Sequence, residues 1–87
     1  MHSYHVVEEL FKENSVELKL MAGSTKNHVT FRIMSSKFPL ERAYGSCAGA
    51  TVILGIVTKH RAEFDLRDPD SISEMIEYIE SGKMWVK

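Results

Sequence analysis

An uninterrupted apolar run predicts a buried strand. Residues Thr51–Val57 (Thr-Val-Ile-Leu-Gly-Ile-Val) carry no charge, and five of the seven are Val, Ile or Leu. β-Branched side chains favour an extended backbone, and an apolar run without polar alternation is typical of a strand covered on both faces. Seven residues with an internal Gly55 are short for the alternative, a buried helix. We therefore interpret this segment as the central strand of one small sheet.

Strict alternation of apolar and polar side chains predicts a β-hairpin earlier in the chain. It occurs in Val16–Met21 and again in His28–Met34, and the segment Ala22–Asn27 between them is rich in turn formers. Such a pattern indicates a hairpin with one face toward solvent. The inward positions are Val16, Leu18, Leu20, Val29, Phe31 and Ile33. A shorter alternation in Ala62–Leu66 follows a polar turn at residues 58–60 and predicts a further strand, with Ala62, Phe64 and Leu66 inward.

Helical spacing marks both ends of the chain. In residues 4–13, four apolar side chains gather on one helical face: Val6, Val7, Leu10 and Phe11. Ser3 is the expected N-cap, and Asn14 tolerates the left-handed backbone that ends a helix.

The second helix has the clearer start signal. Asp68 precedes Pro69, as an N-cap precedes proline at the first helical position, and Ser71 with Glu74 has the spacing of a capping box. Gly82 is the expected stop. One apolar stripe runs along this helix, formed by Ile72, Met75, Ile76 and Ile79.

Residues Ser35–Gly49 are ambiguous. Pro39 suits a helix start, and four later residues recur at helical spacing: Leu40, Ala43, Tyr44 and Cys47. Gly45, Gly49 and the small residues around Cys47 favour a loop or an irregular strand instead. We expect a loop with one short turn of helix.

These elements predict an α+β fold. The order is helix, hairpin, the ambiguous segment, two strands and a helix, which gives a mostly antiparallel sheet of four or five strands with an N-terminal and a C-terminal helix packed on it. Eighty-seven residues suffice for one core, so residues 1–87 are expected to form a single domain. The sequence reproduces no family's motif residues.

Composition points to a soluble protein of the cytoplasm. The 44% hydrophobic and 26% charged residues are typical of globular domains. Cys47 is the single cysteine, so no intramolecular disulfide calls for an oxidising compartment. The first residues lack the basic and apolar regions of a signal peptide, and the longest apolar stretch, Ala48–Val57, falls well below the ~20 residues that span a bilayer.

Charge is unevenly distributed although the net charge is only −1. Residues 1–62 hold eight Lys or Arg and five acids, and residues 63–87 hold three and seven. The solvent-facing side and turn of the hairpin contain Lys19, Lys26, His28 and Arg32, with Lys37, Lys59 and Arg61 as possible neighbours. Small sheets that bind single-stranded nucleic acid combine such a basic face with stacking aromatics. The outward hairpin positions include no aromatic, so a solvated face is the simpler interpretation.

Little in the sequence indicates catalysis or metal binding. His2, His5, His28 and His60 lack the spacing of a metal site, and no metal or other cofactor is expected. Cys47 has no adjacent base, which favours a buried structural thiol over a nucleophile. The glycine-rich segment around it lacks the Gly-Lys-Ser/Thr end of a phosphate-binding loop. Three aspartates, Asp65, Asp68 and Asp70, fall at a strand end and a helix cap, where acids have structural roles.

We therefore expect a non-enzymatic protein-interaction module: a subunit, an adaptor or an inhibitor of a larger protein. Small host-takeover and anti-defence proteins of phages share this size and design, without any sequence match. Met84, Trp85 and Val86 follow the second helix as either a closing strand on the core or an exposed patch. Trp and Met are enriched at interfaces, so these three residues are the candidate site for a partner or for self-association. The alternative function is nucleic-acid binding through Lys19, Lys26, His28 and Arg32.

Overall fold

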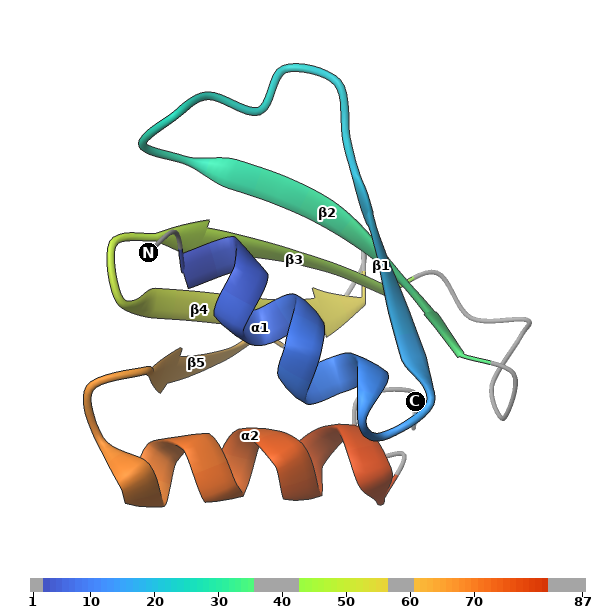
Figure 1. Cartoon of the computed structure of the whole chain (residues 1–87), viewed down its shortest axis with the longest axis vertical. Coiled ribbons are helices and arrows are strands. Elements are labelled where there is room, and N and C mark those ends of the chain that lie inside the picture. Colours follow the sequence, from blue (N-terminus) through green and yellow to red (C-terminus); the bar gives the residue numbers. More distant parts are fainter. Residues whose placement is uncertain (1–2, 36–42, 57–60, 82–87) are drawn as a thin grey trace.

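The computed structural model shows an α+β domain built on one antiparallel sheet (Figure 1). It describes residues 3–35, 43–56 and 61–81. Two helices flank five strands in chain order: α1 (Ser3–Lys12), β1 (Val16–Leu20), β2 (Val29–Ser35), β3 (Ala43–Ala48), β4 (Thr51–Ile56), β5 (Arg61–Asp65) and α2 (Pro69–Glu80). The strands lie in the order β1-β2-β3-β4-β5, and each neighbouring pair is antiparallel. The expected fold class is confirmed, with five strands.

The first helix begins at Ser3 and ends through Asn14 and Ser15. The expected apolar face is present, with Val7 and Phe11 fully buried. The side-chain amide of Asn14 donates a 2.8 Å hydrogen bond to the Leu10 carbonyl oxygen, one of those that a helix end leaves unpaired. The left-handed residue is Ser15, with φ 62°, and not Asn14 as predicted. Asn14 thus ends the helix with its side chain, and the next residue makes the turn into β1.

The predicted hairpin is confirmed as β1 and β2. Val16 pairs with Ser35 and Leu20 with Phe31. In the connecting loop the hydroxyl of Ser24 accepts from the Thr30 N–H at 3.1 Å and lies 2.9 Å from the Met21 carbonyl oxygen. These hydrogen bonds satisfy backbone polar groups at the point where the pairing of β1 with β2 ends and the loop begins.

The ambiguous segment contains a full strand, so the predicted loop with a helical turn is wrong for residues 43–48. Ala43, Gly45 and Cys47 are buried and alternate with the half-buried Tyr44 and Ser46. The alternation has the period of a strand, but its inward side chains are too small to give a hydrophobic signal. Pro39 and Leu40 lie outside the described residues.

The apolar run forms β4, but two details of the prediction are wrong. β4 lies fourth in the sheet, not at its centre. Its two faces also differ: Val52 and Leu54 are fully buried, whereas Thr51 and Ile53 are half-exposed. Both helices lie on one side of the sheet, so only one face of β4 enters the core. The expected turn at residues 58–60 lies outside the described residues.

The predicted cap of the second helix is confirmed, while its capping box and part of its apolar stripe are not. The Asp68 carboxylate accepts from the Asp70 N–H at 3.0 Å, and Pro69 opens the helix. The Ser71 hydroxyl accepts from the Asp65 N–H at 2.8 Å, which ties the helix to β5 instead of closing a capping box. Met75 and Ile79 are buried, but the other two residues of the stripe, Ile72 and Ile76, are half-exposed. The stripe is narrower than expected because α2 lies along the sheet margin. Gly82 lies outside the described residues.

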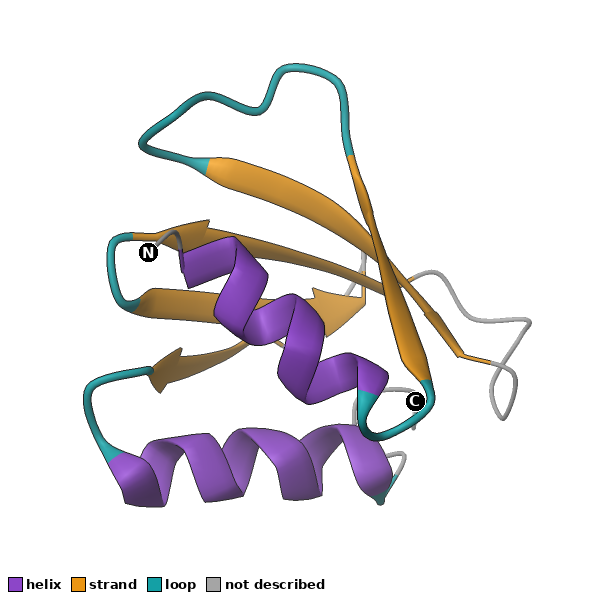
Figure 2. Cartoon of the chain, viewed as in Figure 1, coloured by secondary structure: helices purple, strands orange, loops and turns teal. Residues whose placement is uncertain are grey.

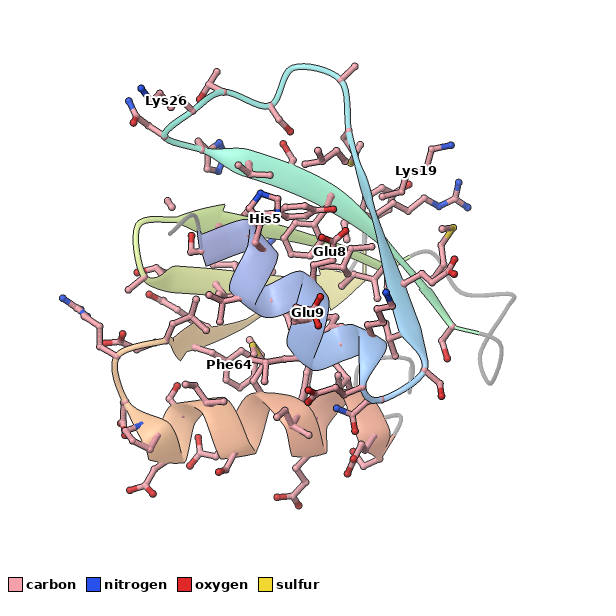
Figure 3. All side chains as sticks on the ribbon, viewed as in Figure 1. His5, Glu8, Glu9, Lys19, Lys26 and Phe64 are labelled. Carbon is pink, nitrogen blue, oxygen red and sulfur yellow. The ribbon has the colours of Figure 1, made fainter. Side chains whose placement is uncertain are left out.

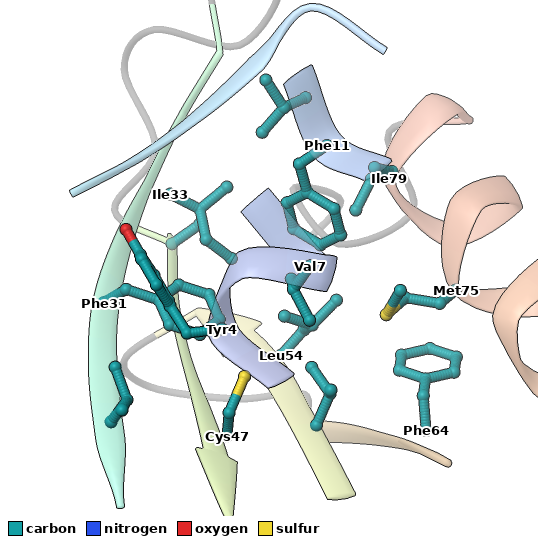
Figure 4. Close-up of a cluster of buried hydrophobic side chains, with 14 residues drawn as sticks. Tyr4, Val7, Phe11, Phe31, Ile33, Cys47, Leu54, Phe64, Met75 and Ile79 are labelled. Carbon is teal, nitrogen blue, oxygen red and sulfur yellow. The ribbon is translucent and has the colours of Figure 1, made fainter. Parts of the chain in front are cut away.

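The core lies between one face of the sheet and the two helices (Figure 2). α1 crosses β3 and β4, and α2 runs beside β5 (Figure 1). Val7 and Phe11 of α1 extend toward Leu54 on the sheet and toward Met75 and Ile79 on α2 (Figure 4). Both helices therefore pack on the same face of the sheet.

Candidate functional site

The face of the sheet opposite the helices is not covered by any described element. We call it the open face. It consists of the residues that alternate with the core positions: Glu17, Lys19, Thr30, Arg32, Met34, Tyr44, Ser46, Ala48, Thr51, Ile53, Gly55, Arg61, Glu63 and Asp65. Because the register is regular, residues on neighbouring strands form straight rows across it.

One of these rows combines three cations with an aromatic ring. Its residues, which we call the basic row, are Lys19, Arg32, Tyr44, Gly55 and Arg61. Lys19 pairs with Arg32, Arg32 with Tyr44, Tyr44 with Gly55 and Gly55 with Arg61. The three cationic side chains are exposed and Tyr44 is half-buried. Within residues 3–35, 43–56 and 61–81, none of the three cations forms an ion pair.

The middle of the open face is hollowed beside this row. The hollow has a volume of about 630 Å³ and is lined by Met21, His28, Thr30, Tyr44, Gly45, Ser46, Ile53, Gly55 and Arg61. Gly55 contributes only backbone next to the Tyr44 ring. Gly55 is itself buried, so the half-buried Tyr44 ring is the accessible group at the centre of the row.

Acids lie on both margins of the open face. Glu17 on β1 and Glu63 on β5 are exposed and occupy rows beside the basic row. Asp65 is paired with Arg67, whose Nε and Nη2 atoms donate hydrogen bonds of 3.0 and 3.1 Å to its two oxygens. This pairing lowers the pKa of Asp65. Glu17 and Glu63 thus each lie two residues from a cation of the basic row on the same edge strand, Lys19 on β1 and Arg61 on β5.

The sequence-predicted basic residues are only partly brought together. Lys19 and Arg32 are neighbours in the basic row, and His28 lines the hollow. Lys26 lies at the distant end of the β1–β2 loop (Figure 3). It lines a second hollow with Ser3, Cys47 and Arg67. Lys37, Lys59 and the predicted patch of Met84, Trp85 and Val86 lie outside the described residues.

Sequence reasoning missed Tyr44 as the aromatic of this face. The hairpin itself has no outward aromatic, as predicted, because Phe31 is fully buried. Tyr44 comes from β3, which pairs with the hairpin through β2. One feature of the sequence could have indicated it. Tyr44 lies between Ala43 and Gly45, two small residues that share the inward face of the strand with Cys47, and this alternation points Tyr44 outward.

Cys47 is buried, in agreement with the structural role expected for it. It is 1% exposed, and burial raises the pKa of its thiol to about 11, with a small opposing effect from a hydrogen bond with Ser3. A nucleophilic cysteine needs the opposite shift. No group of three His, Cys, Asp or Glu side chains that could hold a metal ion occurs in the described part of the chain.

A second polar cluster lies on the surface of α1. The Tyr4 hydroxyl donates to one oxygen of Glu8 at 3.4 Å, and Nδ1 of His5 lies 3.7 Å from the other. Burial raises the pKa of Tyr4, and the nearby Glu8 carboxylate raises it further. The side chains of His5 and Glu8 are exposed on the helix, and neither lines a described hollow. These contacts are typical of neighbours one helical turn apart.

Comparisons with known proteins give no match: no family model, no curated protein and no solved structure is detectably similar to the chain. Among the described residues, neither helix is long and apolar enough to cross a membrane.

Proposed function

We propose that this protein is a non-catalytic binding module that binds single-stranded nucleic acid on the open face. The observation that carries the proposal is the position of Tyr44 in the basic row, between Arg32 and the side-chain-free Gly55. Proteins that bind single strands on a sheet combine aromatic platforms, on which bases stack, with cations that contact the phosphates.

The row has the geometry that this role needs. It crosses all five strands, and four spacings between strands make it about 19 Å long. A strand of a few nucleotides can therefore run along it, with Arg32 and Lys19 on one side of Tyr44 and Arg61 on the other. In the described part of the chain, a duplex would meet a single ring on this face and no helix that could enter a groove, so single strands are the better ligand.

The acids at both margins limit the electrostatic contribution. Three cations on a single strand correspond to a slope of about −2 in a plot of log affinity against log salt concentration. This is a weak salt dependence for a nucleic-acid-binding protein. Stacking on Tyr44 must therefore supply much of the binding free energy. The proposal therefore depends more on Tyr44 than on any one cation.

The test is fluorescence anisotropy of a labelled oligothymidine of about ten nucleotides, titrated with protein at several salt concentrations. We expect Tyr44→Ala to weaken binding by about 1–3 kcal/mol, Tyr44→Phe to retain most of it, and Arg32→Ala to reduce the salt slope by about 0.7. Lys12→Ala removes an exposed cation from α1 and is the matched control. No binding at low salt by the folded parent, or equal binding by Tyr44→Ala, would contradict the proposal.

Recognition of a protein partner is a second candidate function, carried by a different observation. β1 is an edge strand, and three exposed large apolar residues lie on or beside the hairpin: Leu20 (54% exposed), Met21 (38%) and Met34 (36%). Exposed apolar groups beside an open strand edge favour association with another strand. Capture of a partner that is lost when β1 is changed, and not when Tyr44 is changed, would support this candidate over the first.

A further inference from the structure

The outer edge of β1 has backbone groups that pair with no other described strand. The Met21 N–H donates to the Thr30 carbonyl oxygen at 2.9 Å, in register with the pairing of Lys19 and Arg32. Because bonded and non-bonded pairs alternate in an antiparallel ladder, the backbone groups of Glu17 and Lys19 face β2. Those of Val16, Leu18 and Leu20 therefore face the free edge.

The sequence of β1 is complementary to itself about Leu18. When two copies of Val-Glu-Leu-Lys-Leu pair antiparallel with Leu18 opposite Leu18, Glu17 of each copy lies opposite Lys19 of the other. Val16 of each copy lies opposite Leu20 of the other on the helix-covered face, where Leu20 is 54% exposed in the single chain. The N–H and C=O groups that face the free edge are the ones this arrangement bonds.

From this complementarity we propose that the partner of the β1 edge is a second copy of the same chain. Two copies related by a two-fold axis at Leu18 form one continuous ten-stranded sheet, with two identical Glu17–Lys19 pairs across the junction. An isologous interface of this kind brings the same surface of both copies together. The inference rests on the second candidate function, recognition through the sheet edge; it shares Lys19 with the basic row but does not require nucleic-acid binding.

Charge selects this register over its neighbours. A shift by two residues places Lys19 opposite Lys19, or Glu17 opposite Glu17, and a parallel arrangement also aligns like charges. Opposite charges facing each other across strands stabilise pairing, and like charges oppose it. Neither Glu17 nor Lys19 has an ion-pair partner among the described residues, so both are available. A lone lysine would protect the edge from pairing, but the glutamate two residues away makes the edge self-complementary.

The experiment is analytical ultracentrifugation of the purified protein across a wide concentration range, in the absence of nucleic acid. We expect a monomer–dimer equilibrium that Glu17→Lys and Lys19→Glu each weaken by roughly ten- to a hundredfold, because each change replaces two attractive pairs by two repulsive ones. The double variant, Glu17→Lys with Lys19→Glu, exchanges the charges and should restore the parent affinity. Glu63→Lys, the same reversal on the opposite edge strand, is the control and should have no effect.

Mixing the two single variants gives a further test that does not depend on absolute affinity. The Glu17→Lys chain has two lysines on the edge and the Lys19→Glu chain has two glutamates, so an equal mixture should form heterodimers although each variant alone is weakened. A parent that stays monomeric at all concentrations, a dimer insensitive to both charges, or a failure of the double variant and of the mixture to associate would each overturn the inference. A monomeric parent that binds oligothymidine through Tyr44 would leave the first proposed function intact.

Discussion

Gly45 is the position at which the backbone of the sheet lies very close to core side chains. A Cβ atom built at Gly45 would lie 2.5 Å from Cε1 of Phe31 and 2.9 Å from Cδ2 of Leu54, both of which are fully buried. The Phe31 ring therefore occupies the space that a side chain would fill. On the other side of the core the same ring contacts Tyr4, with ring centroids 5.7 Å apart.

We predict that Gly45→Ala destabilises the protein by about 1–3 kcal/mol, since a methyl group forced into a packed core displaces its neighbours. Urea unfolding followed by circular dichroism measures the difference. Ser46→Ala, the next residue on the same strand but on the open face, should change the unfolding free energy by less than about 0.5 kcal/mol. An unchanged stability for Gly45→Ala would mean that Phe31 does not pack against β3.

Cys47 predicts a specific loss of stability at high pH. Its thiol pKa is raised from 9.0 to about 11 in the folded protein, so the folded state holds its proton more tightly than the unfolded state does. The stabilisation is complete below about pH 9 and is lost as the pH rises through about 11. The full loss amounts to about 2–3 kcal/mol above pH 11.

The measurement is the unfolding free energy of the parent and of Cys47→Ala between pH 8 and 11. The pKa values of Tyr4 and Tyr78 are raised as well, so both proteins should lose stability, and only the parent should show the additional loss from the thiol. Parallel curves for the two proteins would show that Cys47 is not protected from ionisation by the fold.

At the scale of the element, β3 shows where a sequence pattern stops being informative. Its six residues, Ala-Tyr-Gly-Ser-Cys-Ala, are mostly small and have little intrinsic preference for a strand. The strand forms because it pairs along its length with β2 and β4, its neighbours in the chain, and that pairing leaves no hydrophobic signal in the sequence of β3 itself. By contrast, the hairpin and the start of α2 follow from local signals, namely alternation and the Asp68-Pro69 cap, and both were predictable.

The residues of the candidate site also fall into two groups, those that the sequence could predict and those that it could not. Lys19 and Arg32 could be found because they belong to one hairpin, whose register is set locally. Tyr44 was missed because β3 was not predicted as a strand, and alternation within a strand does not give the register that places Arg61 in line with Tyr44. The row that joins all four therefore became visible only in the structure.

α2 allows a direct comparison between two adjacent residues of its apolar stripe. Met75 is fully buried beside Phe64, whereas Ile76 is half-exposed. We predict a loss of about 2–5 kcal/mol for Met75→Ala and a clearly smaller loss for Ile76→Ala. Thermal unfolding of both variants measures the difference. Equal losses would indicate that α2 is rotated about its axis relative to the arrangement described here.

At the scale of the whole molecule, the two sides of the sheet differ in charge. The acids of α2, which include Asp70, Glu74, Glu77 and Glu80, are exposed, and its last turn has no basic residue. The basic row lies on the face opposite the helices. The acids of α2 therefore lie on the helical side, whereas Glu63 and Asp65 of β5 lie on the open face with the three cations of the basic row.

The strand order has a consequence for how the chain can be made. Each strand pairs with the one synthesised just before it, so during translation the sheet can grow by one hairpin at a time, without waiting for distant segments. The exception is α1, which is synthesised first but packs against Leu54 of β4 and Ile79 of α2. In a nascent chain the apolar face of α1 can therefore be covered only in part, by the sheet, until α2 has emerged.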